Sequence, residues 1–258
     1  MSAAGHEGVN DHERELQRAF DEQAAAFERA PAQSDPAALE RLVAFAALPA
    51  GSRLLDAGCG PGLVSAALLR ADHLVFGVDL SAEMIARARA RCAEFGDRAR
   101  FERQSVFAPL PVQAFDAAVS RYVIHHVEDP VAFLRRQVEL VRPGGVVVAS
   151  DHTTDPDGTR TAWHNRIERW RDHTHTRSLT LGELADLFAR AGLREIQAVE
   201  EAFTLDFDEW FDRGTPTRSK QEVRSALLSG PGARGFMPRK LGQGVQIDSW
   251  RALVRGVK

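Results

Sequence analysis

The sequence has few cysteines, no long apolar run and no large excess of charge of one sign. Its two cysteines, Cys59 and Cys92, are too few for a secreted disulfide framework and lack the paired spacing of a zinc site. We therefore expect a reducing, cytoplasmic environment and no bound metal. No segment approaches the roughly 18 apolar residues of a membrane span, and residues 1–17 lack the apolar core of a signal peptide. The sequence thus predicts no membrane contact.

The charge of the chain bears on whether it binds nucleic acid. Lysine and arginine total 33 and aspartate and glutamate total 36, a formal charge of -3, and the two signs are intermixed. Nucleic-acid binders depend on a basic face that releases counterions from phosphates, so we expect no nucleic-acid partner. An apolar fraction of 44% is typical of a globular protein with a buried core. At 258 residues we expect a large domain with a small cap.

Apolar runs and helical patterns alternate along most of the chain. Two helices are expected first, near 11–30 and 36–48, because their apolar residues recur at helical spacing. The expected strands are 53–57, 74–80, 99–105, 115–121, 145–151, 194–204 and 245–257. The helices expected between the first five strands are 62–71, 81–95 and 130–141. This alternation predicts an α/β, Rossmann-like, doubly wound sheet that is mostly parallel, with helices on both faces.

Two segments interrupt the alternation. Residues 152–179 are polar and rich in histidine and arginine, with an amphipathic piece around Trp163 and Trp170. The second segment, residues 205–240, is partly polar, and most of it has a helical pattern. We interpret both as helical cap insertions over the mouth of the sheet. The expected organisation is a lid helix at 1–35, a core at 36–151, an insertion at 152–179, and a C-terminal part at 180–258 that contains the second insertion, 205–240.

The segment LLDAGCGPG, residues 54–62, carries the main functional signal. Its glycines follow the first strand directly and precede a helix, where they let the backbone turn sharply and a ligand approach closely. Asp79 ends the second strand, where a carboxylate can accept both hydroxyls of a ribose. Binding of a nicotinamide dinucleotide would require the pattern GxGxxG, but Leu63 stands where its third glycine would be. Asp56, just before the glycines, suits a positively charged ligand better than a pyrophosphate. A nicotinamide-dependent enzyme is therefore the weaker candidate.

Three ordered motifs extend this pattern: DAGCGPG at 56–62, VDLS at 78–81, and RYVIHHVEDP at 121–130 followed by VRPGG at 141–145. Together they resemble class I S-adenosylmethionine-dependent methyltransferases, particularly the branch of quinone-biosynthesis C-methyltransferases and related small-molecule enzymes. The resemblance extends over roughly residues 15–151. It implies S-adenosylmethionine as cofactor, S-adenosylhomocysteine as product, and a seven-stranded sheet with an antiparallel last strand. It also implies a biosynthetic methyl transfer to oxygen, nitrogen or carbon of a metabolite.

The resemblance further assigns residues to the cofactor. Asp79 is expected to hold the ribose, with Leu80 and Met84 beside the adenine. Ser105 stands where the family commonly has an acid, so adenine recognition there would depend on a hydroxyl and on the backbone of the next residue. The expected cofactor-binding residues are Asp56, Gly58, Cys59, Gly60, Asp79, Leu80, Met84, Ser105, Val106 and Arg121.

The lid motif of the family, F-D-x-x-A-x-x-Y, occurs here with a changed last position. Phe20, Asp21 and Ala24 match it, but Phe27 replaces the tyrosine, so the expected hydroxyl is missing. Phe27 can still close the cleft by packing. Simple helix packing of Phe20 and Phe27 is an equal alternative, because aromatic residues at helical spacing usually lie in a core.

Three histidines are the candidate catalytic residues. A sulfonium methyl is already activated, so positioning supplies much of the rate, and a base is needed only where the acceptor loses a proton. His125 and His126 follow the fourth strand and His152 follows the fifth, at the sheet edge where ligands bind. Bracing of the loop is the alternative for His125 and His126, and for His126 it is an equal one. A non-methylating reaction with the same cofactor, such as cyclisation, stays open. We expect a small-molecule acceptor and a monomer or homodimer.

Overall fold

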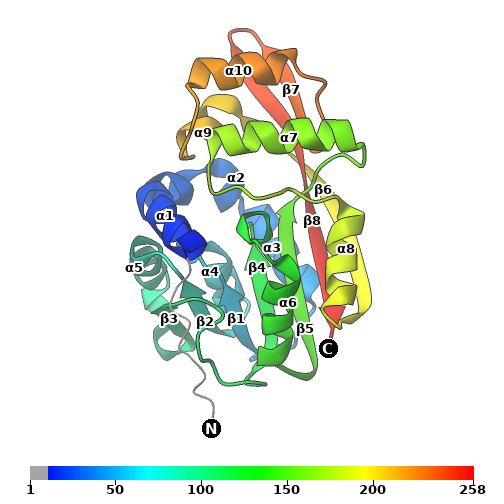
Figure 1. Cartoon of the computed structure of the whole chain (residues 1–258). Coiled ribbons are helices and arrows are strands. Elements are labelled where there is room, and N and C mark those ends of the chain that lie inside the picture. The colour runs from blue at the N-terminus through cyan, green and yellow to red at the C-terminus, as the bar shows by residue number, and fades with distance from the viewer. Residues whose placement is uncertain (1–10) are drawn as a thin grey trace.

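A computed structural model describes residues 11–258 (Figure 1). The strands are β1 (Arg53–Ala57), β2 (Leu74–Asp79), β3 (Ala99–Arg103), β4 (Phe115–Arg121), β5 (Val141–His152), β6 (Arg194–Asp206), β7 (Phe236–Leu241) and β8 (Gly244–Val257). The α-helices are α1 (Asp11–Arg29), α2 (Pro31–Ser34), α3 (Pro36–Ala46), α4 (Leu63–Arg70), α5 (Ala82–Arg91), α6 (Pro130–Leu140), α7 (Gly158–Arg171), α8 (Leu181–Arg190), α9 (Phe207–Asp212) and α10 (Lys220–Ser229). Two 3-10 turns, η1 (Ala93–Arg98) and η2 (Ile124–His126), complete the elements.

The strands form a sheet in the order β3-β2-β1-β4-β5-β8-β6. Neighbours from β3 to β5 run parallel, whereas β8 is antiparallel to both β5 and β6. The predicted Rossmann-like fold with an antiparallel last strand is confirmed. The strand order reverses between β1 and β4, and ligands of such sheets bind outside the carboxyl ends of the strands at this switch point.

The sheet has one strand more than the seven expected. β7 pairs with the outer part of β8, where Phe236 lies opposite Ser249. No local pattern indicated β7, because FMPRKL contains Pro238 and two charged residues, and proline within sheets is confined mainly to edge strands. The predicted helix 81–95 was too long, since α5 ends at Arg91 and a 3-10 turn follows.

The central sheet is buried on both faces because its strands alternate between two apolar cores. In β1, Leu54 packs with α3, α4 and α5, whereas Leu55 packs with α6 and α8. Both leucines are fully buried. Successive side chains of a strand point to opposite faces, so a continuous apolar run such as that of β1 is typical of a parallel sheet covered on both sides.

A cap stands above the carboxyl ends of the central strands and consists of α7, α9, α10, β7 and the outer ends of β6 and β8 (Figure 1). It has an apolar core of its own, formed by Trp163, Ile167, Phe207, Trp210, Val223, Leu227, Phe236 and Ile247, among others. The expected insertions 152–179 and 205–240 contribute these helices and β7. The cap therefore fixes residues of both insertions above the switch point.

The N-terminal helices lie beside the cap, over the same edge of the sheet (Figure 1). The described part of the expected lid segment consists of α1 and α2, and residues 1–10 lie outside the described residues. Among residues 11–258, no helix has both the length and the apolar character needed to cross a membrane.

The cap core predicts a stability effect at Phe236. This side chain is 1% exposed, and its ring contacts those of Trp163, His164 and Trp210. We expect Phe236→Ala to lower the free energy of unfolding by about 3–5 kcal/mol, because it leaves a cavity in a packed core. Urea denaturation measures this. Val112→Ala, at a position 64% exposed, serves as the control, and an equal effect of both variants would contradict the described packing.

Candidate active site

The loop after β1 has a shape that side chains would obstruct. Gly58 has φ +76, and a Cβ there would come within 2.7 Å of Val123 Cγ2. A Cβ at Gly62, φ +79, would come within 2.9 Å of Ala88 Cα. Gly60 also has a positive φ, +52, but nothing lies within 4 Å of its Cβ direction. The loop thus packs tightly on its neighbours at two glycines and leaves open space at the third.

Asp79 holds this loop to the end of β2. Its Oδ2 accepts a hydrogen bond from the Gly60 amide at 2.9 Å, and its Oδ1 accepts from the Ser81 amide at 2.9 Å. Burial raises the pKa of Asp79 to about 6, although these backbone donors oppose the shift. The carboxylate is therefore fixed in orientation at the switch point.

A second buried carboxylate, Asp56, lies at the end of β1. It is 1% exposed and accepts a hydrogen bond from Ser65 Oγ at 2.6 Å. Burial raises its pKa to about 7, against the effect of the Ser65 hydroxyl. A buried carboxylate that is costly to ionise is stabilised by a nearby cation. The two carboxylates together suit a ligand with hydroxyls and a positive charge.

These groups line a cavity of about 300 Å³ at the switch point, which we call the loop cavity. The structure brings all ten residues expected at the cofactor to its wall: Asp56, Gly58, Cys59, Gly60, Asp79, Leu80, Met84, Ser105, Val106 and Arg121. Phe20 and Phe27 of the lid helix line it as well. An adenosyl group fits this lining, because apolar side chains flank one part and carboxylates and glycine amides another.

Polar contacts bind the lid helix α1 to α5 and to the residue that precedes it, Ser81. Glu28 pairs with Arg87 at 2.5 Å and with Arg91 at 2.6 Å, both on α5. Asp21 accepts a hydrogen bond from Ser81 Oγ at 2.5 Å. These contacts keep Phe20 and Phe27 over the loop cavity.

Among the polar residues of the lid that sequence reasoning missed is Glu13. Its carboxylate accepts a hydrogen bond from Ser105 Oγ at 2.5 Å, and both residues line the loop cavity. The acid that the family commonly has at the position of Ser105 is thus replaced in space by an acid from α1. No local pattern could reveal this, since 92 residues separate the two positions.

The end of β4 forms the boundary between core and cap. Arg121 donates to the carbonyl oxygens of Gln33 at 2.8 Å and Ala32 at 3.2 Å, so its side chain holds α2 in place. Tyr122 has φ +58, an unusual conformation for a bulky residue that is found mainly at functional sites. Its ring stacks on His152 at 4.4 Å between centroids.

His125 and Asp151 form a buried dyad. His125 Nδ1 lies 2.5 Å from Asp151 Oδ1, and the backbone amides of His125 and His152 also donate to this carboxylate, at 3.2 and 2.7 Å. Because the carboxylate accepts, Nδ1 carries the proton and Nε2 keeps a free lone pair. Burial disfavours the imidazolium, but the charge and hydrogen bond of Asp151 outweigh it and raise the pKa of His125.

The two other candidate histidines have different surroundings. His126 Nδ1 lies 3.1 Å from the carbonyl oxygen of Thr174, and burial, followed by the charge of His125, lowers its pKa to about 4. Burial and the charge of His125 lower the pKa of His152 well below its usual value. Both rings therefore stay neutral at physiological pH, which favours packing or hydrogen-bonding roles for them.

A second, smaller pocket lies under the cap, and we call it the histidine–arginine pocket. Its wall includes His125, His152, His175, Arg171, Arg213 and Trp210. It shares Phe27, Gln33, Tyr122 and His126 with the loop cavity, so the two spaces adjoin. Despite these histidines, no group of three or more histidine, cysteine, aspartate or glutamate side chains within 11–258 is arranged to hold a metal ion.

Comparisons with known proteins agree with this geometry. Residues 28–198 match the family described as "Methyltransferase domain". A ubiquinone biosynthesis O-methyltransferase from Xanthomonas axonopodis pv. citri (strain 306) is 30% identical over 172 residues, 64% of this chain and 70% of that protein. For a protein of the same name from Xanthomonas campestris pv. campestris (strain B100), the alignment spans 52% of its length.

A further relative is the uncharacterized methyltransferase YcgJ from Bacillus subtilis, which is 28% identical over 213 residues, 80% of this chain and 84% of that protein. Its crystal structure has a TM-score of 0.76 and covers 85% of this chain and 97% of that chain. A Burkholderia thailandensis 1,6-didemethyltoxoflavin-N1-methyltransferase with bound 1,6-didemethyltoxoflavin and S-adenosylhomocysteine has a TM-score of 0.57 at 19% identity, covering 100% of this chain and 93% of that one. Both structures share the fold.

The position of Asp79 predicts its effect on ligand affinity. We expect Asp79→Ala to weaken S-adenosylhomocysteine binding by about 1.5–3 kcal/mol, because charged hydrogen bonds are lost. Isothermal titration calorimetry measures this, with Asp72→Ala, at an exposed acid near α4, as the matched control. Unchanged affinity in Asp79→Ala would show that the ligand does not bind at this carboxylate.

The raised pKa of Asp79, about 6, predicts a pH dependence of the same affinity. Ligand hydroxyls bind the ionised carboxylate, so protons compete with the ligand as the pH falls below about 6. We expect the wild-type affinity to be constant near pH 8 and to fall by up to about tenfold per pH unit below the pKa. Calorimetry from pH 5 to pH 8 should show that the affinity of Asp79→Ala changes less with pH than that of the wild type. An identical pH dependence in both proteins would contradict the assignment of Asp79 to the ligand hydroxyls.

Proposed function

Because this chain belongs to the family of S-adenosylmethionine-dependent methyltransferase domains, we propose that it methylates a small molecule that extends from the histidine–arginine pocket to the loop cavity. The observation that supports this most directly is the wall common to the two spaces, formed by Phe27, Gln33, Tyr122 and His126. A methyl donor in the loop cavity and an acceptor under the cap would meet there. Holding two reactants in line supplies a large part of the rate of such transfers.

Bound S-adenosylmethionine supplies an activated methyl group on a sulfonium, so the protein's residues mainly bind and orient. In this proposal Asp79 holds the ribose hydroxyls, and the carboxylate of Asp56 favours the positive charge of the ligand. Gly60 leaves room for close approach of the ligand to the backbone. Phe20 and Phe27 of α1 exclude water from the reacting atoms, because both side chains line the cavity from the lid side.

The His125–Asp151 dyad favours an acceptor that loses a proton from oxygen or nitrogen. His125 Nε2 accepts that proton as the new bond to the methyl carbon forms and the bond to sulfur breaks. Asp151 accepts from Nδ1 and so keeps the imidazole in the required tautomer. The names of the relatives, a ubiquinone biosynthesis O-methyltransferase and a 1,6-didemethyltoxoflavin-N1-methyltransferase, are consistent with a small acceptor.

A panel of phenols, alcohols, amines and acids tests the proposal. Each is incubated with the protein and S-adenosylmethionine labelled in its methyl group, and S-adenosylhomocysteine and the labelled product are measured by mass spectrometry. We expect at least one acceptor to gain the label. If the cofactor binds but the label stays on sulfur with every acceptor, the transferase proposal is wrong and the non-methylating alternative is favoured.

The dyad predicts the pH dependence of this transfer. His125 acts as a base only when neutral, and Asp151 raises its pKa above the ordinary value, so the rate should rise with pH through that raised pKa and then level. Asp151→Asn removes the charge that holds the pKa up, so its profile should shift to lower pH with a lower plateau. If the pH–rate profile of Asp151→Asn is the same as that of the wild type, His125 is not the base.

His125→Ala should lower kcat by about 100-fold or more, the usual contribution of a general base, while S-adenosylhomocysteine affinity stays unchanged. His173→Ala, at an exposed histidine in the loop after α7, is the control. If His125→Ala keeps full turnover at all pH values, positioning alone accounts for catalysis.

A further inference from the structure

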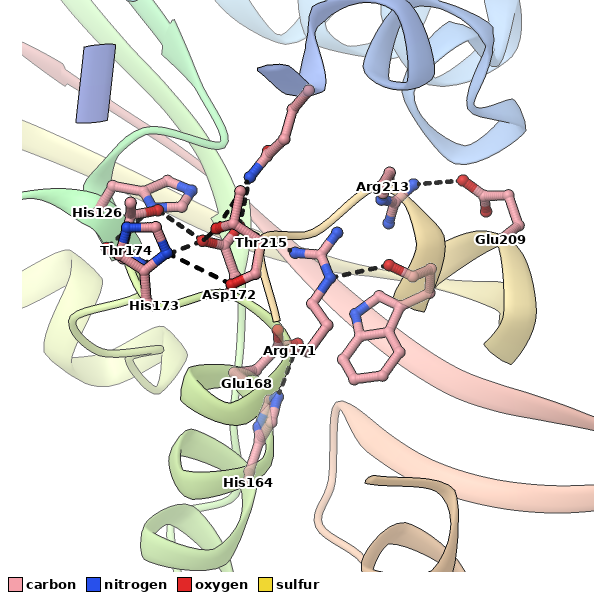
Figure 2. Close-up of polar contacts among 12 residues, drawn as sticks. His126, His164, Glu168, Arg171, Asp172, His173, Thr174, Glu209, Arg213 and Thr215 are labelled. Carbon is pink, nitrogen blue, oxygen red and sulfur yellow. Dashed lines mark hydrogen bonds and ion pairs between the residues drawn. The ribbon is translucent and has the colours of Figure 1, made fainter. Parts of the chain in front are cut away.

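Two buried arginines stand in the histidine–arginine pocket, and the proposed function gives neither of them a role. Arg171 is the last residue of α7, and Arg213 follows α9. Both line the pocket, and their side chains are only 10% and 4% exposed. Figure 2 shows Arg171 and Arg213 converging between the end of α7 and the turn after α9. Burying two guanidinium groups together is costly unless charge or hydrogen bonds compensate.

Arg171 has one donor that nothing in the fold uses. Its Nε donates to the carbonyl oxygen of Trp210 at 2.8 Å, and its Nη1 donates to Asp172 Oδ2 at 3.3 Å. Its Nη2 is buried and has no hydrogen-bond partner among residues 11–258. A guanidinium cannot deprotonate to escape this cost, so an acceptor of hydrogen bonds is the group that this position requires.

The positive charge of Arg171 acts on Arg213. Its Nη1 donates to Glu209 Oε1 at 2.9 Å, one turn earlier on α9. Burial, and next the positive charge of Arg171, lower the pKa of Arg213 to about 10. Two cations that repel each other in a buried pocket are both stabilised by an anion placed between them.

Carboxylates also lie beside these arginines, but none of them accepts a hydrogen bond from Arg171 Nη2. Asp172 is occupied by other donors: Thr174 Oγ1 at 2.7 Å, Thr215 Oγ1 at 3.1 Å and Gln23 Nε2 at 3.2 Å (Figure 2). Glu168 is engaged by His164, with 3.7 Å between Nε2 and Oε1. Burial would raise the pKa of Glu168, but His164 and the charge of Arg171 outweigh it and lower that pKa. Both acids are thus engaged by other groups, and the free Nη2 of Arg171 is left for an acceptor from outside the fold.

Resting on the acceptor site of the proposed function, we propose that Arg171 and Arg213 form an anion subsite that selects acceptors carrying a carboxylate. The pocket adds a cavity of only about 20 Å³ to the loop cavity, which suits a small terminal group rather than a whole molecule. A planar carboxylate matches the fork of a guanidinium. The remainder of the acceptor would then extend past Tyr122 and His126 toward the loop cavity.

Three probes of similar size and different charge test the subsite: benzoate, benzamide and benzylamine. Each is titrated into protein saturated with S-adenosylhomocysteine, and binding is measured by calorimetry and by fluorescence, since the Trp210 ring lies 5.4 Å from the Arg171 guanidinium carbon. We expect benzoate to bind about tenfold or more tightly than benzamide, because a charged hydrogen bond contributes at least that much. Benzylamine should bind weakest. Tighter binding of benzylamine would instead point to a cation site at Glu168 and would overturn the proposal.

Substitutions test whether Arg171 and Arg213 are the residues that cause the preference for benzoate. Arg171→Gln and Arg213→Gln should each remove the preference for benzoate, and Arg171→Lys, which keeps the charge but loses the fork, should retain part of it. Arg166→Gln is the matched control, because Arg166 lies on the same helix, is exposed and stacks on Trp170. Circular dichroism and S-adenosylhomocysteine affinity, measured on every variant, show whether the cap is still folded. If Arg171→Gln unfolds, Arg213→Gln carries the test.

The outcome separates this proposal from the methyltransferase proposal. If wild-type protein binds benzoate no better than benzamide, or if the preference survives in Arg171→Gln and Arg213→Gln, the anion subsite is wrong. Methyl transfer to neutral acceptors, measured on the same preparations, would then still support the proposed function. If benzoate is preferred and both variants lose the preference while label never leaves the cofactor, the subsite stands and the transferase proposal fails.

Discussion

The active site depends on the contact between the glycine loop after β1 and the carboxylate at the end of β2. Gly60 and Ser81 both donate backbone hydrogen bonds to Asp79, and this ties two parallel strands together at the point where the sheet order reverses. The loop can follow this path only because Gly58 and Gly62 leave no Cβ against Val123 and Ala88. A loop cavity of fixed shape results, before any ligand binds.

The second requirement is a lid and a cap that approach this cavity from separate parts of the chain. The lid helix is held by Glu28 on α5, and the cap is carried on β6 and β8, which extend beyond the sheet. Tyr122 and His126 lie where both meet the core. The loop cavity is therefore formed mainly by the core and the lid, whereas the histidine–arginine pocket is formed by the cap together with the segments that follow β4 and β5.

Much of the core was predictable from local pattern. β1, the glycines of the loop after it and Asp79 at the end of β2 lie within about 30 residues of sequence. The alternation of apolar runs with helices predicts a parallel sheet, in which these residues meet at one edge. The same reasoning placed His125 and His152 at the sheet edge. Three features that join distant parts of the chain could not be predicted. They are the hydrogen bond between Glu13 and Ser105, the shared pocket of Arg171 and Arg213, and the edge strand β7, whose sequence contains a proline. The positions of these residues depend on how the lid packs on the core and how the cap folds on itself, and local periodicity contains no information on either.

A crystal structure with S-adenosylhomocysteine bound would test the central claim most directly, which is that the loop cavity and the histidine–arginine pocket meet at the sulfur. The account predicts the ribose on Asp79 and the sulfur at the wall formed by Tyr122 and His126, with open space toward His125. A ligand bound with its adenine at that wall, or with its sulfur turned away from the cap, would contradict it.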